Sequence, residues 1–339
     1  MNTSQVSEVD QAAALLRSAT DVTLLGHINP DADALGSALA LGIALRQRGA
    51  RVRVSFAEPA HTPESLRGLD TAGLIVSPAR LPGHDPLLVV VDTPSLARLG
   101  ALGRRVRATV AAGGAVLVVD HHASNTRFGT HHVVDTSAEA SAVLALRILD
   151  AMDHELDEAI ASCLYAGVVT DTSSFRRAGP HTHQMAARLV EAGANPEKLG
   201  RELMDEHPFA WLPMLADVLA TARLEPDAAR GLGLVHAVVT RELAASVRVE
   251  EVESVIDVVR STTEAEVALV LKELPARGSG RRWSVSLRAK SRLDVSVAAQ
   301  SLGGGGHRLA SGCTLEGTAE DALAMLRTAL NEAPLLCVR

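Results

Sequence analysis

The amino-acid sequence predicts an α/β protein with two domains, the first built on a Rossmann-like parallel sheet and the second a smaller α+β domain. Short apolar runs alternate with segments of helical periodicity through the first half of the chain, which is typical of a parallel sheet covered on both faces. At 339 residues, of which 47% are hydrophobic, the chain can bury two ordinary cores. A polar stretch with proline and glycine at 225–233 separates this half from strands of alternating pattern.

Four short apolar segments predict the strands of the first sheet. They are VTLLG (22–26), RVRVSF (51–56), LLVVV (87–91) and AVLVV (115–119). Apolar residues recur at helical spacing between these strands, in segments 33–49 and 95–114. The helical pattern then continues through segments 139–153, 157–169 and 181–193, so residues 137–222 are predicted to be mostly helical.

The second domain is predicted from the elements that follow the polar stretch. Strands are expected at 232–240, 266–274, 282–289 and 311–317, and helices at 294–302 and 319–333. We therefore place the first domain at residues 1–195, a helical linker at 196–230 and the second domain at 231–339.

The composition argues against several classes of protein. A net charge of −7 does not suit sequence-independent electrostatic binding of long nucleic acid. With only 2% aromatic residues, an aromatic surface for stacking bases is not expected either. Cys163, Cys313 and Cys337 are widely spaced and odd in number, so neither a disulfide framework nor a zinc cluster is indicated. The first 20 residues do not resemble a signal peptide, and no apolar stretch has the length that a bilayer requires. We expect a cytoplasmic protein that does not bind a membrane.

Ionisable side chains follow four of the apolar runs. They are His27, Asp31 and Asp33 after the first strand, Asp92 after LLVVV, Asp120, His121 and His122 after AVLVV, and Asp171 after the run 165–169. One aspartate after a strand is usually a helix cap or a turn residue. The carboxyl ends of parallel strands meet at one edge of the sheet, however, and carboxylates gathered there raise one another's pKa values. No lysine or arginine lies inside these motifs, so we expect bound metal among them.

The motifs HINPDADALGS, VVVDTPS, DHHASN and VVTDTSSF resemble, in this order, the four motifs of the DHH phosphoesterase superfamily. Downstream, GGGGHRLASG (303–312) resembles the glycine-histidine motif of the DHH-associated C-terminal domain. The resemblance covers nearly the whole chain and is strongest to the bacterial nanoRNase and pAp-phosphatase branch. It implies an active-site cleft between two domains and a hydrolase that acts on ester bonds.

The resemblance also implies a role for each motif residue. One metal ion would be held by His27, Asp31 and Asp92, and a second by Asp33, Asp92, His121 and Asp171, with Asp92 bridging. The mixed nitrogen and oxygen donors suit manganese, two Mn²⁺ ions per active site, for which Mg²⁺ or Co²⁺ could substitute. We assign Asp120 and His122 to catalysis. Asp120 would orient an imidazole, and His122 would contact the scissile phosphate or protonate the leaving oxygen unless its hydrogen bond is purely structural.

A basic segment of the second domain predicts the phosphate end of the substrate site. Residues 276–308 hold seven basic side chains and one acidic one, although the whole chain is acidic. In the strand 282–289, Trp283, Val285 and Leu287 are expected to face one way, and Ser284, Ser286 and Arg288 the other. Arg288 could then bind a phosphate through both ends of its guanidinium group. The loop Gly303, Gly304, Gly305, Gly306 and His307 could hold an anion on its backbone amides.

The predicted function is the manganese-dependent hydrolysis of short oligoribonucleotides to mononucleotides, with dephosphorylation of adenosine 3′,5′-bisphosphate to AMP. The partners implied are short single-stranded RNA or DNA and nucleotide bisphosphates, and the resemblance is compatible with a homodimer. Alternatives within the superfamily are a phosphodiesterase of linear or cyclic dinucleotides such as c-di-AMP, a RecJ-like single-strand exonuclease and, less favoured, a family II pyrophosphatase. A nucleotide-binding regulator with a silent site is the alternative from another class, although every ligand position is intact.

Overall fold

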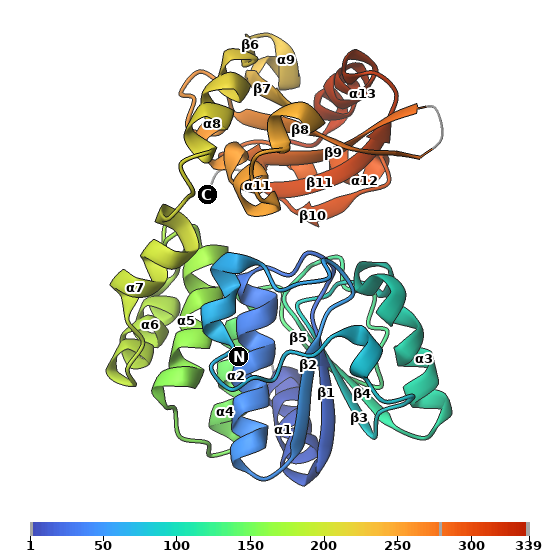
Figure 1. Ribbon diagram of the computed structural model, residues 1–339, viewed down its shortest axis with the longest axis vertical. Helices are drawn as coiled ribbons and strands as arrows, with labels where there is room; N and C mark the ends of the chain where they lie inside the picture. The colour runs from blue at the N-terminus through green and yellow to red at the C-terminus, as the bar shows by residue number, and fades with distance from the viewer. Residues whose placement is uncertain (1–2, 278–279, 337–339) are drawn as a thin grey trace. The chain divides into compact units, whose positions relative to one another are not determined.

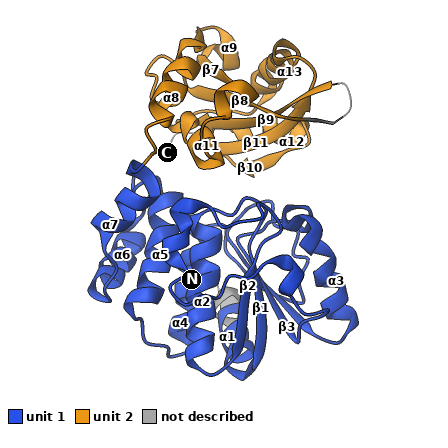
Figure 2. Ribbon diagram, in the orientation of Figure 1, with its two compact units in different colours: residues 1–206 blue, residues 207–339 orange. Residues whose placement is uncertain are grey.

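The structure, a computed structural model, describes residues 3–277 and 280–336. The chain divides into two compact units, unit 1 at residues 1–206 and unit 2 at residues 207–339 (Figure 2). Each unit has its own sheet and its own hydrophobic core. The domain boundaries that the sequence suggests, at 195 and 230, stay a prediction.

Unit 1 contains a five-stranded sheet in which all neighbouring strands are parallel (Figure 1). Its strands are β1 (Asp21–Leu25), β2 (Arg51–Ser55), β3 (Leu87–Val91), β4 (Ala115–Asp120) and β5 (His131–Val134), in the order β2-β1-β3-β4-β5. The central strand β3 is a continuous run of leucine and valine because helices cover both faces of the sheet. Alternate residues of β3 accordingly pack into different cores, Val89 on one face and Val90 on the other.

Helices pack on both faces of this sheet. The core on one face joins the strands to α1 (Thr3–Ser18), α2 (Ala32–Gln47), α4 (Ser141–Ala151) and α5 (Glu158–Asp171), and the core on the other joins them to α3 (Gly103–Ala111). Helix α2 is buried from Ala32 through Leu45, since the sheet, α4 and α5 surround it. Gly36 permits the close approach of α5, because a Cβ there would lie 2.3 Å from the carbonyl oxygen of Cys163.

The remaining elements of unit 1 are short or lie after the sheet. They are the 3₁₀ segments Glu64–Leu69, Pro78–Arg80 and Leu96–Leu102, the helices α6 (Pro180–Glu191) and α7 (Pro196–Gly200), and a π-helical turn at Arg201–Asp205. Among the described residues, no helix is long and apolar enough to cross a membrane.

The strand order creates a switch point at the carboxyl ends of β1 and β3. The chain leaves β1 through α2 and returns in β2 on one side of β1, whereas β3 pairs with the opposite side. The segments that follow β1 and β3 therefore separate at the edge of the sheet and leave a crevice, which is where ligands bind in open α/β sheets. This edge carries the motif residues.

Unit 2 contains a six-stranded mixed sheet in the order β10-β11-β9-β8-β7-β6. Its strands are β6 (Arg223–Glu225), β7 (Leu234–Val239), β8 (Val267–Arg277), β9 (Gly280–Ala289), β10 (Gly305–His307) and β11 (Ala310–Glu316). Only β7 and β8 pair in parallel among the described ladders of this sheet. One core joins the sheet to α8 (Trp211–Ala220) and α11 (Val249–Val259), and the other joins it to α12 (Val295–Ser301) and α13 (Ala319–Glu332). Two single turns, α9 (Ala228–Gly231) and α10 (Arg241–Ala244), complete unit 2.

The fold class predicted from the sequence is confirmed, with elements that the prediction did not contain. The added strands are β5, β6 and β10, and α11 is an added helix of unit 2, whereas α8 lies within the stretch 137–222 that the sequence predicts to be mostly helical. Met214 and Val218 of α8 pack in the core of unit 2. Cys163 and Cys313 are buried free thiols in the described part of the chain, and Cys337 lies outside the described residues.

Candidate metal centre

The eight ionisable motif residues gather at the carboxyl edge of the unit 1 sheet. Seven of them follow β1, β3 or β4, or end β4, as the sequence predicts. Asp171 arrives differently, because it is the last residue of helix α5 and not the end of a strand. Side-chain donor atoms of His27, Asp31 and Asp92 lie within 4.8 Å of one another, and those of Asp33, His121 and Asp171 do the same.

The first group is centred on the imidazole of His27. Its Nε2 lies 3.6 Å from Oδ2 of Asp31 and 3.6 Å from Oδ2 of Asp92. Its Nδ1 lies 2.8 Å from the carbonyl oxygen of Ile28, which can only accept a hydrogen bond. A proton on Nδ1 would satisfy that contact, and Nε2 faces the carboxylates. The other oxygen of Asp31 caps helix α2 by accepting from the amide of Ala34 at 2.9 Å, so Asp31 serves both the helix and the group.

The second group contains the buried carboxylate of Asp33. The amides of Ser141 and Ala142 donate to its two oxygens at 2.6 and 2.9 Å, and so fix its orientation at the start of α4. Gly167 of α5 leaves room for this carboxylate, because a Cβ there would lie 2.6 Å from Oδ1 of Asp33. The packing of α2 against α4 and α5 therefore holds Asp33 at the edge of the sheet.

His121 faces the same group from the end of β4. Its Nε2 lies 3.2 Å from Oδ2 of Asp171 and 3.5 Å from Oδ1 of Asp92. Its Nδ1 lies 3.1 Å from the carbonyl oxygen of Ala138, which again leaves Nε2 directed at the carboxylates. Both histidines thus present the same ring nitrogen to the acids, which is the arrangement that metal-binding imidazoles adopt.

Asp92 lies between the two groups. Its Oδ2 faces His27, and its Oδ1 faces His121 and accepts a hydrogen bond from the hydroxyl of Ser141 at 2.8 Å. Asp92 also has a φ of 53°, a left-handed conformation that is uncommon for residues other than glycine. Backbone strain of this kind occurs mostly at functional sites. The geometry suits a carboxylate that bridges two ions.

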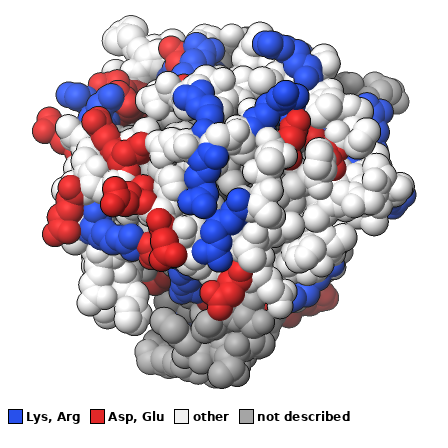
Figure 3. All heavy atoms as spheres, turned by 90° about the horizontal axis from the view of Figure 1, so that it is seen from below, with Lys and Arg blue, Asp and Glu red and all other residues white. Residues whose placement is uncertain are grey.

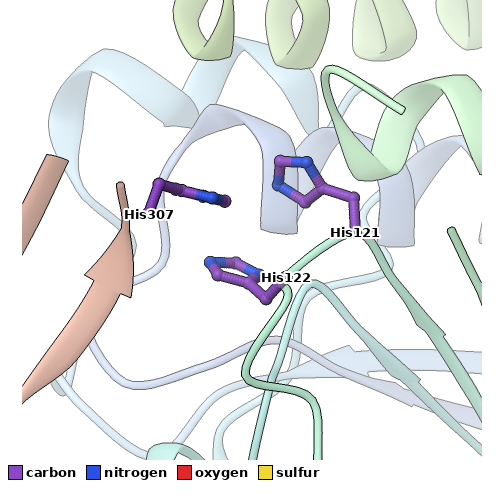
Figure 4. Close-up of side chains that lie close together, drawn as sticks. All are labelled: His121, His122 and His307. Atoms are coloured by element: carbon purple, nitrogen blue, oxygen red, sulfur yellow. The ribbon is translucent and has the colours of Figure 1, made fainter. Parts of the chain in front are cut away.

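Asp120 and His122 form a pair beside the two groups. The Nδ1 of His122 donates to Oδ1 of Asp120 at 2.7 Å, and Nδ2 of Asn125 donates to Oδ2 of Asp120 at 2.5 Å. Both oxygens of this fully buried carboxylate are therefore engaged within the protein. The other polar atom of the His122 ring is Nε2. His121 and His122 directly follow β4, and their rings lie close together (Figure 4). The ring centroids are 4.9 Å apart.

The charges of this edge are balanced by protons on the histidines. Burial alone would lower the pKa of His27, but hydrogen bonding and charge from Asp31 and Asp92 raise it to about 10. The same holds for His121: burial alone would lower its pKa, but the carboxylates of Asp171 and Asp92 raise it to about 11. Burial and the negative charge of Asp92 raise the pKa of Asp33 well above its ordinary value. Cationic charge is thus strongly favoured at this edge.

Two arginines that the motifs do not contain lie beside the cluster. Nη2 of Arg98 is 3.1 Å from Nδ1 of His27, and Nη2 of Arg177 donates to the backbone oxygen of Asp171 at 2.9 Å. The sequence motifs end before either arginine, so the prediction missed both. Each arginine follows a motif aspartate by six residues, and this shared spacing is the signal that could have found them.

The predicted substrate residues lie together on the sheet of unit 2. Arg288 of β9 is opposite Ala310 of β11, and Ala310 is opposite His307 of β10, so the three form one row across the strands. Trp283, Val285 and Leu287 pack in the core on the other face, as the alternating pattern predicts. Arg288 and His307 therefore share a sheet face, with a small alanine between them.

Three of the four loop glycines have structural reasons for being glycine. Gly303 and Gly306 have positive φ values of 77° and 140°, and a Cβ at Gly304 would lie 2.1 Å from the carbonyl oxygen of Gly312. Gly305 has neither reason, because its φ is not positive and a Cβ there would meet no heavy atom within 4 Å. The missing side chain at Gly305 leaves space above the sheet, which is a feature of sites where a ligand approaches the backbone closely.

Comparison with known proteins decides the family. The N-terminal domain model of the DHH family matches residues 21–168, and the DHHA1 domain matches residues 233–333. The chain is 30% identical to the bifunctional oligoribonuclease and PAP phosphatase NrnA of Thermus thermophilus, over 86% of this chain and 83% of that protein. The chain belongs to the DHH family. It is a hydrolase of phosphoester bonds, as the sequence predicts.

Other relatives agree with this membership. The cyclic-di-AMP phosphodiesterase GdpP of Bacillus subtilis is 23% identical over 94% of this chain, which spans 48% of that protein. The fold matches an exopolyphosphatase-related protein of Bacteroides fragilis with a TM-score of 0.84 at 20% identity, covering 96% of both chains. It also matches RecJ of Thermus thermophilus in complex with Mn²⁺, with a TM-score of 0.54 at 15% identity, over 96% of this chain and 54% of RecJ.

Proposed function

We propose that this DHH-family hydrolase is a manganese-dependent nanoRNase that degrades short oligoribonucleotides and also dephosphorylates adenosine 3′,5′-bisphosphate. The observation that carries the proposal is the pair of ligand groups that meet at Asp92 on the switch-point edge. The similarity to NrnA over 83% of that protein supports the choice of substrates.

The donor set of the edge fits two divalent cations. The residues proposed as ligands are His27, Asp31 and Asp92 for one ion, and Asp33, Asp92, His121 and Asp171 for the other. Four carboxylates would balance two divalent charges, and two imidazole nitrogens complete a mixed shell that suits manganese. Two such ions lower the pKa of a shared water and stabilise an in-line displacement at phosphorus.

The chain's own residues orient the proposed reaction. Asp120 holds the ring of His122 through Nδ1, so Nε2 is the atom that can give a proton to the leaving oxygen. Burial alone would lower the pKa of His122, but the hydrogen bond to Asp120 and the charge of Asp92 outweigh it and raise the pKa, which favours the protonated imidazole. Asn125 in turn fixes Asp120. The pair is proposed to act as the general acid and its orienting carboxylate.

Unit 2 is proposed to bind a second phosphate or the terminal group of the substrate. Arg288 and His307 share a sheet face, and Gly305 leaves space beside them. A guanidinium group and open backbone suit an anion of the size of phosphate.

Short substrates suit the charge of this protein better than long ones. On the face drawn in Figure 3, lysine and arginine side chains occur together with aspartate and glutamate side chains. With a net charge of −7, the chain lacks the excess of positive charge that binds long nucleic acid without regard to sequence. Hydrolysis of linear or cyclic dinucleotides is the second candidate, supported by the similarity to GdpP.

Product analysis tests the proposal. Manganese-loaded protein is given RNA and DNA of two to twenty nucleotides labelled at either end, together with adenosine 3′,5′-bisphosphate and c-di-AMP. We expect mononucleotides from the shortest RNAs and AMP from the bisphosphate. Preferential cleavage of c-di-AMP would favour the second candidate, and processive degradation of the longest strands would favour a RecJ-like exonuclease.

A further inference from the structure

The sheet of unit 2 holds a buried lysine that neither the predicted site nor the proposed mechanism uses. Lys272 lies on β8, and its side chain is only 8% exposed. Lysine is seldom buried to this degree, because removing an ammonium group from water costs free energy unless partners replace the water. An apolar side chain would fill the same space without that cost. The presence of lysine at this position therefore needs a reason that depends on its charge or its hydrogen bonds.

The ammonium group of Lys272 has two partners. It donates to Oε2 of Glu253 on α11, a side chain that is 53% exposed, and to Oγ of Ser286 on β9 at 2.8 Å. The pair with Glu253 neutralises the charge. The bond to Ser286 links the lysine to the strand that carries Arg288.

The strand register places Lys272, Ser286 and Arg288 on one sheet face. Lys272 is opposite Ser284, so the bond from Lys272 to Ser286 runs diagonally along β9 toward Arg288. Ser286 is in turn opposite Gly312, and Gly312 is opposite Gly305. The hydroxyl of Ser286 therefore belongs to the row that ends at the open glycine, next to the row of Arg288 and His307.

The bond from Lys272 determines what the hydroxyl of Ser286 can do. Its oxygen accepts the lysine proton, so its own hydrogen is directed to another acceptor. Among the side-chain hydrogen bonds of the described residues, none has this hydroxyl as donor. An acceptor on the sheet face, in the space beside Gly305, would complete its bonding. A phosphate oxygen is such an acceptor.

We propose that Lys272 is a positioning residue that turns the hydroxyl of Ser286 toward a terminal phosphomonoester of the substrate, which Arg288 holds. This inference rests on the proposed function of the Arg288 face. A terminal phosphomonoester has three non-bridging oxygens, whereas an internal phosphodiester has two. The guanidinium group of Arg288 can bind two oxygens, so the additional hydroxyl donor of Ser286 favours the terminal phosphate, which offers a third. Lys272 thereby contributes to the choice of phosphorylated ends over hydroxyl ends.

The experiment compares a diadenylate that carries a 5′-phosphate with the same diadenylate that has a 5′-hydroxyl. The variants are Lys272→Met, Ser286→Ala and the double variant, and the wild-type preference is the ratio of the two kcat/KM values. We expect each single variant to lower this ratio by about tenfold, since a hydrogen bond to a charged group is lost. Most of the loss should appear in KM, and the double variant should lose no more than either single one, because Lys272 is proposed to act only through the hydroxyl of Ser286.

Lys290→Met is the matched control, since Lys290 is exposed and donates to the backbone oxygens of Thr262 and Thr263. It should leave the preference unchanged. Equal losses on both substrates, or additive losses in the double variant, would overturn the positioning role. If Lys272→Met does not fold, unchanged preference in Ser286→Ala overturns it by itself. A wild-type protein that cleaves neither diadenylate would instead refute the proposed function.

Discussion

The proposed division of labour at the end of β4 predicts a specific result for Asp120→Asn. The carboxylate of Asp120 accepts from Nδ1 of His122 at 2.7 Å, from the amide of His121 at 3.0 Å and from Asn125 at 2.5 Å. An asparagine keeps the shape but removes the negative charge, and its amide can present only one oxygen to these donors. The imidazole of His122 then loses a charge-assisted hydrogen bond, whereas no proposed metal ligand is altered.

The size of the effect follows from that bond. A hydrogen bond to a charged group contributes about 1.5–3 kcal/mol, and loss of an orienting partner typically lowers activity by about 10- to 100-fold. The pH dependence should change as well. Asp120 is a main reason that the pKa of His122 is raised, so the variant holds its proton less firmly. Activity that needs protonated His122 should then decline at a lower pH, so the basic limb of the pH–rate profile should shift to lower pH.

The assay measures kcat against pH on a diribonucleotide together with the manganese content of the purified protein. We expect an unchanged metal content, a kcat lowered by about 10- to 100-fold and a shifted basic limb. His122→Ala serves for comparison and should also keep its metal while losing about 10²- to 10⁴-fold in rate. Loss of metal from Asp120→Asn, or an unshifted profile at wild-type rate, would refute the assignment.

Further predictions concern the ligands and the substrate face. Asp92→Ala should remove nearly all hydrolysis of every substrate, and retention of more than a few per cent of the turnover with saturating manganese would exclude a bridging role. Arg288→Ala should lower kcat/KM on dinucleotides by about ten- to a hundredfold and hardly affect bis-p-nitrophenyl phosphate, so equal losses on both would assign Arg288 to the fold. Gly305→Ala should keep its melting temperature, since the added methyl group meets no atom within 4 Å, but should weaken binding of adenosine 3′,5′-bisphosphate in calorimetry. His27 and His121 have pKa values of about 10 and 11, so manganese titration at pH 7 should release protons, and calorimetry in buffers of different ionisation enthalpy measures their number. Because both pKa values lie above the ordinary 6.5, the metal-free protein should lose stability as the pH rises from about 6.5 to 10–11, and a flat denaturation midpoint across this whole window would contradict the assigned contacts.

The sequence predicted β1, β3 and β4 of the first sheet well because these strands are buried along almost their whole length. Runs such as LLVVV can be recognised without any knowledge of their neighbours. The missed strands lack this signal, since β5 reads HHVV and β10 reads GGH. Helix α11 carries an apolar stripe, VEEVESVIDVV, that could have been recognised by its spacing.

The candidate site was predictable to the extent that it follows strand ends. The rule that parallel strands end at one edge brought seven of the eight residues together, but Asp171 reaches them from a helix whose packing the sequence does not reveal. The partners that fix the site come from elsewhere in the chain. Ser141 contacts Asp92 from α4, and Ser286 accepts from Lys272 of the neighbouring strand. Such contacts depend on tertiary packing, which periodicity alone does not encode.

The rate of diribonucleotide hydrolysis against bound manganese per chain tests the central proposal most directly. Protein freed of metal is loaded with known equivalents of Mn²⁺, and the rate is measured at each loading. Because Asp92 faces both ligand groups, we expect little activity without metal and a main rise between one and two equivalents. Full activity at one equivalent, or hydrolysis that persists in the metal-free protein, would contradict the account.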